Sequence, residues 1–433
     1  MKNLKNIFVV VAISLTFSVF AQQTPALSQE GIITIVGATA HIGDGTVIEN
    51  SIISFENGKI IAVADATTSK IALRGTVIKA EGKHVYPGFI APVSSLGLGE
   101  IDAVRATVDQ DEIGDFIPNI RSLVAYNTES RIIESMRPNG VLIGQIAPKG
   151  GRISGTSSIV QFDAWNWEDA AIKVDDAIHL HWPNSFRRGR WWLGEPRGYQ
   201  PNKKYAKQTN EISQFLAQAN AYQKTTQAIM NESYNAMAGV FNGKQKLYVY
   251  ADGEKEIIDA ISQLDKAGIK NIVLVGGYEA YKVTDLLKKH NIPVLVQRVH
   301  SSPKQADEDY DLPFKLAKTL TDKGVLVGLQ ALGQMERMNT RNLPFYAGQV
   351  AGQGLDKEKA LQLITSNTAK ILGIDGDYGT LSVGKSATLF ISEGDALDMR
   401  TNLLTKAYID GRDISLETHQ TKLWKRYAKK YGQ

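Results

Sequence analysis

Residues 85–95 read VYPGFIAPVSS, and this stretch decides the fold that the sequence predicts. It follows a series of short β-branched runs that begins near residue 30 and is punctuated by turn residues. Asn57 and Gly58 separate two of these runs, and both tolerate the positive φ of a tight hairpin turn. The segment 30–88 is therefore predicted to be a small β layer that precedes a larger domain.

Downstream of residue 88, apolar runs alternate with stretches of helical periodicity. This alternation predicts parallel βα units, and its length fits a (β/α)8 TIM-like barrel of about 250 residues, an α/β fold. The barrel is assigned to residues 89–374. Strands are predicted at 141–146, 159–162, 247–250, 272–275, 293–296 and 325–329, and helices at 254–267, 279–290, 313–323 and 356–372.

The segments NGKIIAV (57–63) and AEGKHVYPGFI (80–90) together resemble the entry into the barrel of the amidohydrolase superfamily, in its imidazolonepropionase-like and dipeptidase-like branch. ALQLITSNTAKILGIDGDYGTLSVGKSATLFI (360–391) resembles the last barrel helix of that family and the return to its β layer. The resemblance implies a small β-sandwich composed of 30–88 and 375–415. It also implies metal-dependent hydrolysis of C–N bonds, with neutral histidines and carboxylates that activate a bound water.

The residues that the resemblance places at the metal are not metal ligands. In the family, Pro-Gly-Phe-Ile leads into Asp-x-His-x-His, and the two histidine positions here are Val93 and Ser95. The later ligand positions fall on Tyr250, Val275 and Leu332. Valine and leucine have no lone pair to offer a metal. The resemblance therefore implies the family fold with a degenerate metal site and no metal cofactor.

One histidine pair keeps a ligand-like spacing. His179 and His181 share a face if their segment is a strand, because side chains alternate along a strand. A displaced divalent metal such as zinc would need a third ligand, for which Asp163, Asp175 and Asp176 are the candidates. If the protein is an enzyme with a displaced or absent metal, the candidate catalytic residues are His179, His181, Asp252, Glu279 and His300.

Residues 183–205, PNSFRRGRWWLGEPRGYQPNKKY, interrupt the barrel pattern and open an insertion that extends to about residue 240. The favoured interpretation is an insertion whose tryptophans cover apolar core while its arginines face water. The alternative is a binding loop, since guanidinium groups and indole rings suit an anion or a flat ring. The candidate binding residues are Arg187, Arg188, Arg190, Trp191 and Trp192.

The first 21 residues have the pattern of a secretory signal peptide: Lys2 and Lys5, then an apolar run, then Ala21 before the expected cleavage site. The expected location is the periplasm. No other window reaches a membrane-spanning length, so the protein is not expected to span a membrane. Without cysteine, disulfides and thiolate ligands are excluded. Loss of the leader reduces the formal charge from +4 to +2, which does not predict nucleic-acid binding.

The last segment, 416–433, is predicted to be a C-terminal helix. Leu423, Trp424, Tyr427 and Tyr431 share one helical face, and cations occupy the other. The favoured interpretation is that the aromatic face docks on the body of the protein, because an ordered terminus needs such an anchor. A membrane-surface helix is the alternative.

Taken together, these features predict a secreted amidohydrolase-like protein that has lost the standard metal site. It would bind a small-molecule or peptide-like ligand, or form a hetero-oligomer with an active relative. The alternative is an active C–N hydrolase with a displaced or absent metal.

Overall fold

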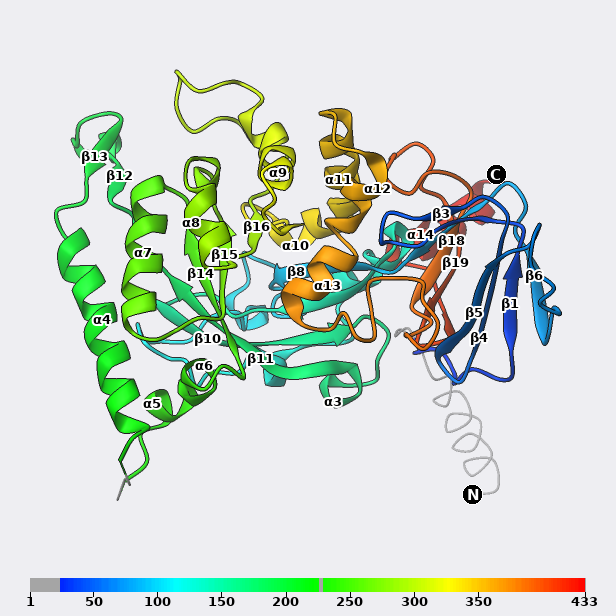
Figure 1. Ribbon diagram of the computed structural model, residues 1–433, viewed down its shortest axis with the longest axis horizontal. Helices are drawn as coiled ribbons and strands as arrows, with labels where there is room; N and C mark the ends of the chain where they lie inside the picture. The colour runs from blue at the N-terminus through cyan, green and yellow to red at the C-terminus, as the bar shows by residue number, and fades with distance from the viewer. Residues whose placement is uncertain (1–23, 226–228, 433) are drawn as a thin grey trace, which may run out of the picture.

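The computed structural model describes residues 24–225 and 229–432, so the predicted leader at 1–21 lies outside the described residues. Figure 1 shows a β-sandwich at one end of the molecule and a larger barrel region, flanked by helices, at the other. Within the described ranges, no helix is long and apolar enough to cross a membrane.

The sandwich consists of two sheets built from both ends of the chain. β-branched residues dominate its strands because they fit a pleated, half-buried surface. The first sheet has the order β5-β4-β1-β6, with β1 (Ile33–Val36), β4 (Ser51–Glu56), β5 (Lys59–Asp65) and β6 (Thr76–Lys79). The second has the order β20-β19-β18-β7-β2-β3, with β2 (Thr39–His41), β3 (Val47–Ile48), β7 (His84–Pro87), β18 (Leu389–Ser392), β19 (Leu404–Ile409) and β20 (Arg412–Ile414).

Local turn chemistry and long-range pairing fix this sandwich. Asn57 and Gly58 have φ values of 49° and 76° and form the tight turn between β4 and β5. In the core, the rings of Phe55 and Tyr408 meet edge to face with centroids 5.0 Å apart. β7 pairs with β18, so the C-terminal segment completes a sheet that the N-terminal segment begins.

The barrel sheet contains eight strands in sequence order. They are β8 (Phe89–Ser94), β9 (Val141–Ile146), β10 (Ile153–Gln161), β11 (Ala171–His181), β14 (Lys246–Ala251), β15 (Ile272–Gly276), β16 (Val294–Val296) and β17 (Val327–Leu329). The segment after α12 (Lys357–Gln362) spans the gap between the first and last strands. The Leu363 carbonyl accepts the Leu329 N–H at 3.1 Å, and the Ile364 carbonyl accepts the Ile90 N–H at 3.0 Å. The TIM-like barrel is thereby nearly closed, as predicted.

The first half of the barrel departs from the expected βα rhythm. β10 is antiparallel to both β9 and β11, whereas the pairs from β11 through β17 are parallel. The connection between β9 and β10 contains only residues 147–152. A parallel crossover needs a dozen or more residues, so this short connection forces an antiparallel return.

Regular helices accompany the second half of the barrel. In α7, Ile257, Ile261 and Leu264 recur at helical spacing and are buried, and Gly268 follows the helix with a φ of 81°. The helices ahead of α14 are α2 (Arg131–Glu134), α3 (Trp167–Ala170), α4 (Tyr205–Tyr222), α5 (Glu232–Ala236), α6 (Ala238–Phe241), α7 (Glu254–Lys266), α8 (Thr284–Lys289), α9 (Leu312–Asp322), α10 (Glu336–Asn339), α11 (Leu343–Gly352), α12 (Lys357–Gln362) and α13 (Ser366–Leu372).

The Arg/Trp segment forms a β-hairpin that projects from the barrel (Figure 1). Its strands are β12 (Phe186–Arg188) and β13 (Tyr199–Pro201), and a short 3-10 turn, η4 (Trp191–Leu193), lies at its tip. Trp191 is 59% exposed and Trp192 66% exposed. The prediction that these tryptophans cover core is therefore wrong, because the hairpin carries them away from the body of the protein.

The C-terminal helix, α14 (His419–Tyr431), begins with a capping box between Thr418 and Thr421 and buries none of its residues. Trp424, Tyr427 and Tyr431 are all exposed. The prediction that the aromatic face docks on the body is therefore wrong: the helix is held near its first turn, where the His419 N–H donates to Glu134 at 2.9 Å.

Candidate functional site at the barrel mouth

A cavity of about 160 Å³ lies at the C-terminal ends of the barrel strands. This is the face at which barrels of this type carry their chemistry. Its walls come from β8, β11, β14, the connection after β9 and the loop after β17. The lining residues are Val93, Ser94, Ala147, Pro148, Lys149, His181, Tyr250 and Leu332.

Val93 reaches the cavity through an irregularity in β8. The register between β8 and β9 shifts between Ala91 and Ser94, and Val93 has a φ of 52°. A positive φ is strained for a β-branched residue, so the surrounding packing must hold this conformation in place. The bulge turns the valine side chain into the barrel interior, where it joins an apolar cluster with Val275.

A buried carboxylate lies beside this apolar cluster. Glu336, the first residue of α10, accepts hydrogen bonds from the Ser94 hydroxyl at 2.5 Å and the Ser95 hydroxyl at 2.6 Å. The Lys149 ammonium lies 3.2 Å from the same carboxylate. Sequence reasoning missed Glu336 because the closing acidic residue was expected between Gln330 and Leu332. Glu336 is the first acidic residue after Leu332 in the chain, and this proximity could have indicated it.

Replacing Glu336 by glutamine should lower the free energy of unfolding by about 2 kcal/mol. Hydrogen bonds to a charged group contribute about 1.5–3 kcal/mol each, and the amide would keep the shape while losing that charge. Chemical denaturation measures the change. Glu232→Gln is the control: this glutamate is exposed, and no such loss is expected there.

His179 and His181 do share one face of β11, as their spacing predicts. His179 is fully buried, and its Nδ1 lies 2.8 Å from the Tyr250 hydroxyl. The His181 ring stacks on Tyr250 with centroids 4.1 Å apart. Burial lowers the pKa of His179 to about 3 and that of His181 to about 4, so both rings are neutral near neutral pH. Only His181 lines the cavity.

The three aspartates proposed as a third metal ligand are engaged elsewhere. Asp163 forms ion pairs with Arg137 and Arg412. Asp175 pairs with Arg121 at 2.9 Å, and Asp176 accepts hydrogen bonds from Ser157 and Gln145. In the described part of the chain, no three His, Asp or Glu side chains gather as a metal site requires. The structure therefore does not bring these aspartates to the histidine pair.

The remaining catalytic candidates also lie apart from the cavity. Asp252 pairs with Lys304 at 2.6 Å, and Glu279 pairs with Lys282 at 2.7 Å. His300 is exposed and packs edge to face on Tyr346, with centroids 5.0 Å apart. Partial burial lowers the pKa of His300. These residues follow different strands and form no common constellation with His179 and His181.

Residues 319–418 match the model of the amidohydrolase family. This stretch includes β17, α10 through α13 and the return to the sandwich, which are the elements that close the barrel and complete the composite sheet.

Solved structures extend the likeness to the whole fold. An amidohydrolase from Thermotoga maritima matches with a TM-score of 0.76 at 22% identity, over 88% of this chain and 99% of that one. A Xaa-Pro dipeptidase with methionine bound in its active site matches with a TM-score of 0.55 at 13% identity, over 89% and 100%. No curated protein sequence matches the chain. At these identities the likeness concerns the fold.

The residues that the resemblance assigns to the metal positions come together in space. Val93, Tyr250 and Leu332 line the cavity, and Val275 lies in the same apolar cluster. Ser95 donates to Glu336 instead. The buried Nε2 of His179 has no hydrogen-bond partner among the described residues, which would suit a metal. Its surroundings are aromatic and aliphatic, however, so the residues present do not fit the one or two divalent ions of the superfamily.

The Arg/Trp hairpin has internal partners for part of its charge. Glu195 pairs with Arg187 at 2.5 Å and with Arg190 at 3.0 Å, and these bonds lower its pKa to about 2. Arg197 lies over the ring of Trp191 at 5.2 Å. Arg187 and Arg190 are therefore committed to a carboxylate within the hairpin, and Arg188 and the two tryptophans remain the exposed features of the predicted binding loop.

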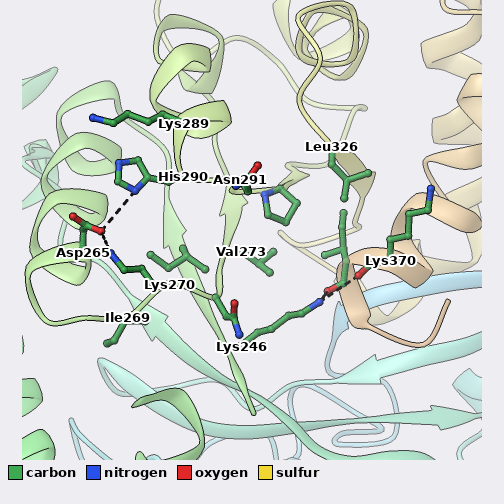
Figure 2. Close-up of a pocket in the computed structure, with 14 residues that line it drawn as sticks. Lys246, Asp265, Ile269, Lys270, Val273, Lys289, His290, Asn291, Leu326 and Lys370 are labelled. Carbon is green, nitrogen blue, oxygen red and sulfur yellow. Dashed lines mark hydrogen bonds and ion pairs between the residues drawn. The ribbon is translucent and has the colours of Figure 1, made fainter. Parts of the chain in front are cut away.

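A larger cavity, of about 570 Å³, lies at the opposite end of the barrel (Figure 2). Figure 2 shows the Lys246 side chain extended toward the end of α13, where its ammonium donates to the carbonyls of Lys370 and Ile371. Asp265 pairs with Lys270. The contacts of Lys246 anchor the end of α13 to the barrel, and residues at this face of such barrels serve stability.

Proposed function

We propose that this protein is a secreted amidohydrolase homologue without the metal-dependent hydrolysis of its superfamily, and that it binds a small or peptide-like ligand at the barrel mouth. One observation supports the proposal: Val93, Val275 and Leu332, which the resemblance assigns to metal-ligand positions, belong to one apolar cluster. Such side chains cannot coordinate a cation or ionise a bound water.

The shape of the barrel mouth supports a ligand with an apolar group. The inner cavity, about 160 Å³, is smaller than a pocket for a whole drug-sized molecule and suits a single apolar side chain. An outer cleft of about 420 Å³ shares Lys149 with it and is lined by both polar and apolar residues, with Gln110 and Arg337 among the polar ones. A peptide-like ligand would place one side chain inward and its polar backbone in the outer cleft.

The proposal predicts that chelation leaves the protein unchanged. The mature protein, purified without chelator, should contain far less than one metal ion per chain by mass spectrometry. Its melting temperature should be the same with and without a strong chelator, because no folded-state ligand is removed. A stoichiometric ion that is lost in a His179→Ala, His181→Ala variant would instead favour an active hydrolase with a displaced metal.

Binding is tested by closing the inner cavity. Thermal shift with a panel of dipeptides should identify stabilising ligands in the wild-type protein, and Leu332→Trp should abolish the shift by filling the cavity. Leu403→Trp is the matched control, since Leu403 is 60% exposed and remote from the cavity lining. If Leu332→Trp keeps the full shift, the ligand does not enter the barrel mouth. Co-purification with an active relative would instead support the second expectation from the sequence, that the protein forms a hetero-oligomer.

A further inference from the structure

Helix α14 presents an aromatic stripe to solvent. Trp424 is 68% exposed, Tyr427 48% and Tyr431 68%. These residues lie three and four positions apart, so they follow one line along the helix surface. The helix buries none of its residues, and its backbone is anchored to the body at His419, in its first turn. A stripe of three large aromatic rings is therefore left without a covering surface from the described chain.

The opposite face of α14 is strongly basic. The helix contains no acidic residue, and its cations are Lys422, Lys425, Arg426, Lys429 and Lys430. Lys425 pairs with Glu417, just ahead of the helix, at 2.8 Å. The structure records no ion pair for the other four within its described ranges. A helix of this composition attracts a surface that is both apolar and negatively charged.

An aromatic stripe flanked by cations matches the chemistry of a bilayer surface. Tryptophan and tyrosine favour the boundary between headgroups and acyl chains, because their rings are apolar and their polar atoms stay hydrated. Lysine and arginine stems reach along the apolar surface while their charges remain at the headgroups. Anionic headgroups add about 1 kcal/mol for each cation near the surface. A second protein chain would need carboxylates arranged to meet the same cations.

We propose that α14 binds the surface of an anionic lipid bilayer, with Trp424, Tyr427 and Tyr431 in the interfacial region and the lysines at the headgroups. The helix would lie in the plane of the surface as a peripheral contact. The body of the protein stays in water, because the contact involves only the last helix. This role is independent of what the barrel mouth binds.

Vesicle co-sedimentation of the full-length mature protein tests the proposal. We expect binding to vesicles of phosphatidylcholine mixed with phosphatidylglycerol, little binding to phosphatidylcholine alone, and loss of binding at high salt. The variant Trp424→Ser, Tyr427→Ser, Tyr431→Ser should bind at least about tenfold more weakly, since each lost ring removes apolar area from the interface. Lys422→Gln and Lys429→Gln should each weaken binding about fivefold.

The hairpin provides the matched control. Trp191→Ser, Trp192→Ser, Tyr199→Ser also removes three exposed aromatic rings beside cations, and it should leave vesicle binding unchanged. Binding lost in the hairpin variant but kept in the α14 variant would overturn the proposal. So would a wild-type protein that ignores anionic vesicles. A dimer by light scattering that the α14 variant converts to monomer, without vesicle binding, would show that a second copy covers the stripe. Circular dichroism and melting should be unchanged in all variants.

Discussion

Replacing Asp163 by asparagine should lower the free energy of unfolding by about 3–5 kcal/mol. The Asp163 carboxylate is 1% exposed and lies 3.3 Å from Arg137, whose side chain is 5% exposed, and 2.9 Å from Arg412. It also accepts the Ala26 N–H at 2.9 Å, which fastens the first described residues to the barrel. The amide keeps the size of the carboxylate but leaves two guanidinium groups without their counter-charge.

Asp175→Asn is the matched control for this prediction. Asp175 pairs with Arg121, but the two side chains are 35% and 40% exposed, so the pair contributes only about 0–1 kcal/mol. Its φ of 50° also suits asparagine. Chemical denaturation of both variants under identical conditions measures the difference. Equal losses in the two variants would show that burial does not determine how much the Asp163 ion pairs contribute to the free energy of unfolding.

Acid should destabilise the protein through its buried histidines. The pKa of His179 falls from 6.5 to about 3 on folding because burial disfavours the charged ring. Protons therefore bind the unfolded chain first as pH falls. The contribution of neutral His179 to the free energy of unfolding is fully present above about pH 6.5 and is lost progressively toward pH 3. Between about pH 7 and pH 4, His179 should account for a loss of about 3 kcal/mol.

The variant His179→Phe isolates this contribution, because phenylalanine keeps the ring beside Tyr248 and cannot titrate. Its stability should fall about 3 kcal/mol less than that of the wild type over this pH range, whatever constant offset comes from losing the contact with Tyr250. Urea denaturation at several pH values provides the measurement. Parallel pH profiles for the two proteins would contradict the buried, neutral state of His179.

Asp176 should change the stability on acidification in the direction opposite to His179. Burial raises its pKa from 3.8 to about 6, so the folded state binds the proton first as pH falls. This group therefore adds stability as pH drops from about 6 to 4, by about 2 kcal/mol. Asp176→Asn should lose more stability on acidification than the wild type does, in contrast to His179→Phe.

Much of the fold was predictable because its determinants are local. The turn at Asn57 and Gly58, the β-branched runs and the helical spacing in α7 each act within a few residues of chain. The antiparallel β10 was missed because its beginning was placed at 159 and not at Ile153. With six residues in the connection, the strand had no room for a crossover.

In the candidate site, too, the features that depend on residue type were predictable and those that depend on long-range contacts were not. The sequence alone excludes Val93, Val275 and Leu332 as metal ligands, because their side chains have no lone pair in any arrangement. It could not place Glu336 against Ser94, since that contact depends on α10 folding back over the first strand of the barrel.

Only the tertiary structure decided which apolar residues are covered. Helical spacing in α14 predicts an aromatic face, which the helix has, and the Arg/Trp segment was predicted to place its tryptophans over core. Whether that face meets the protein depends on where the ends of the segment are fixed. The hairpin projects from the barrel, and α14 is attached at its first turn, so Trp192 and Trp424 face solvent. Side-chain pattern is a local property, whereas burial is set by contacts between residues that lie far apart in the chain.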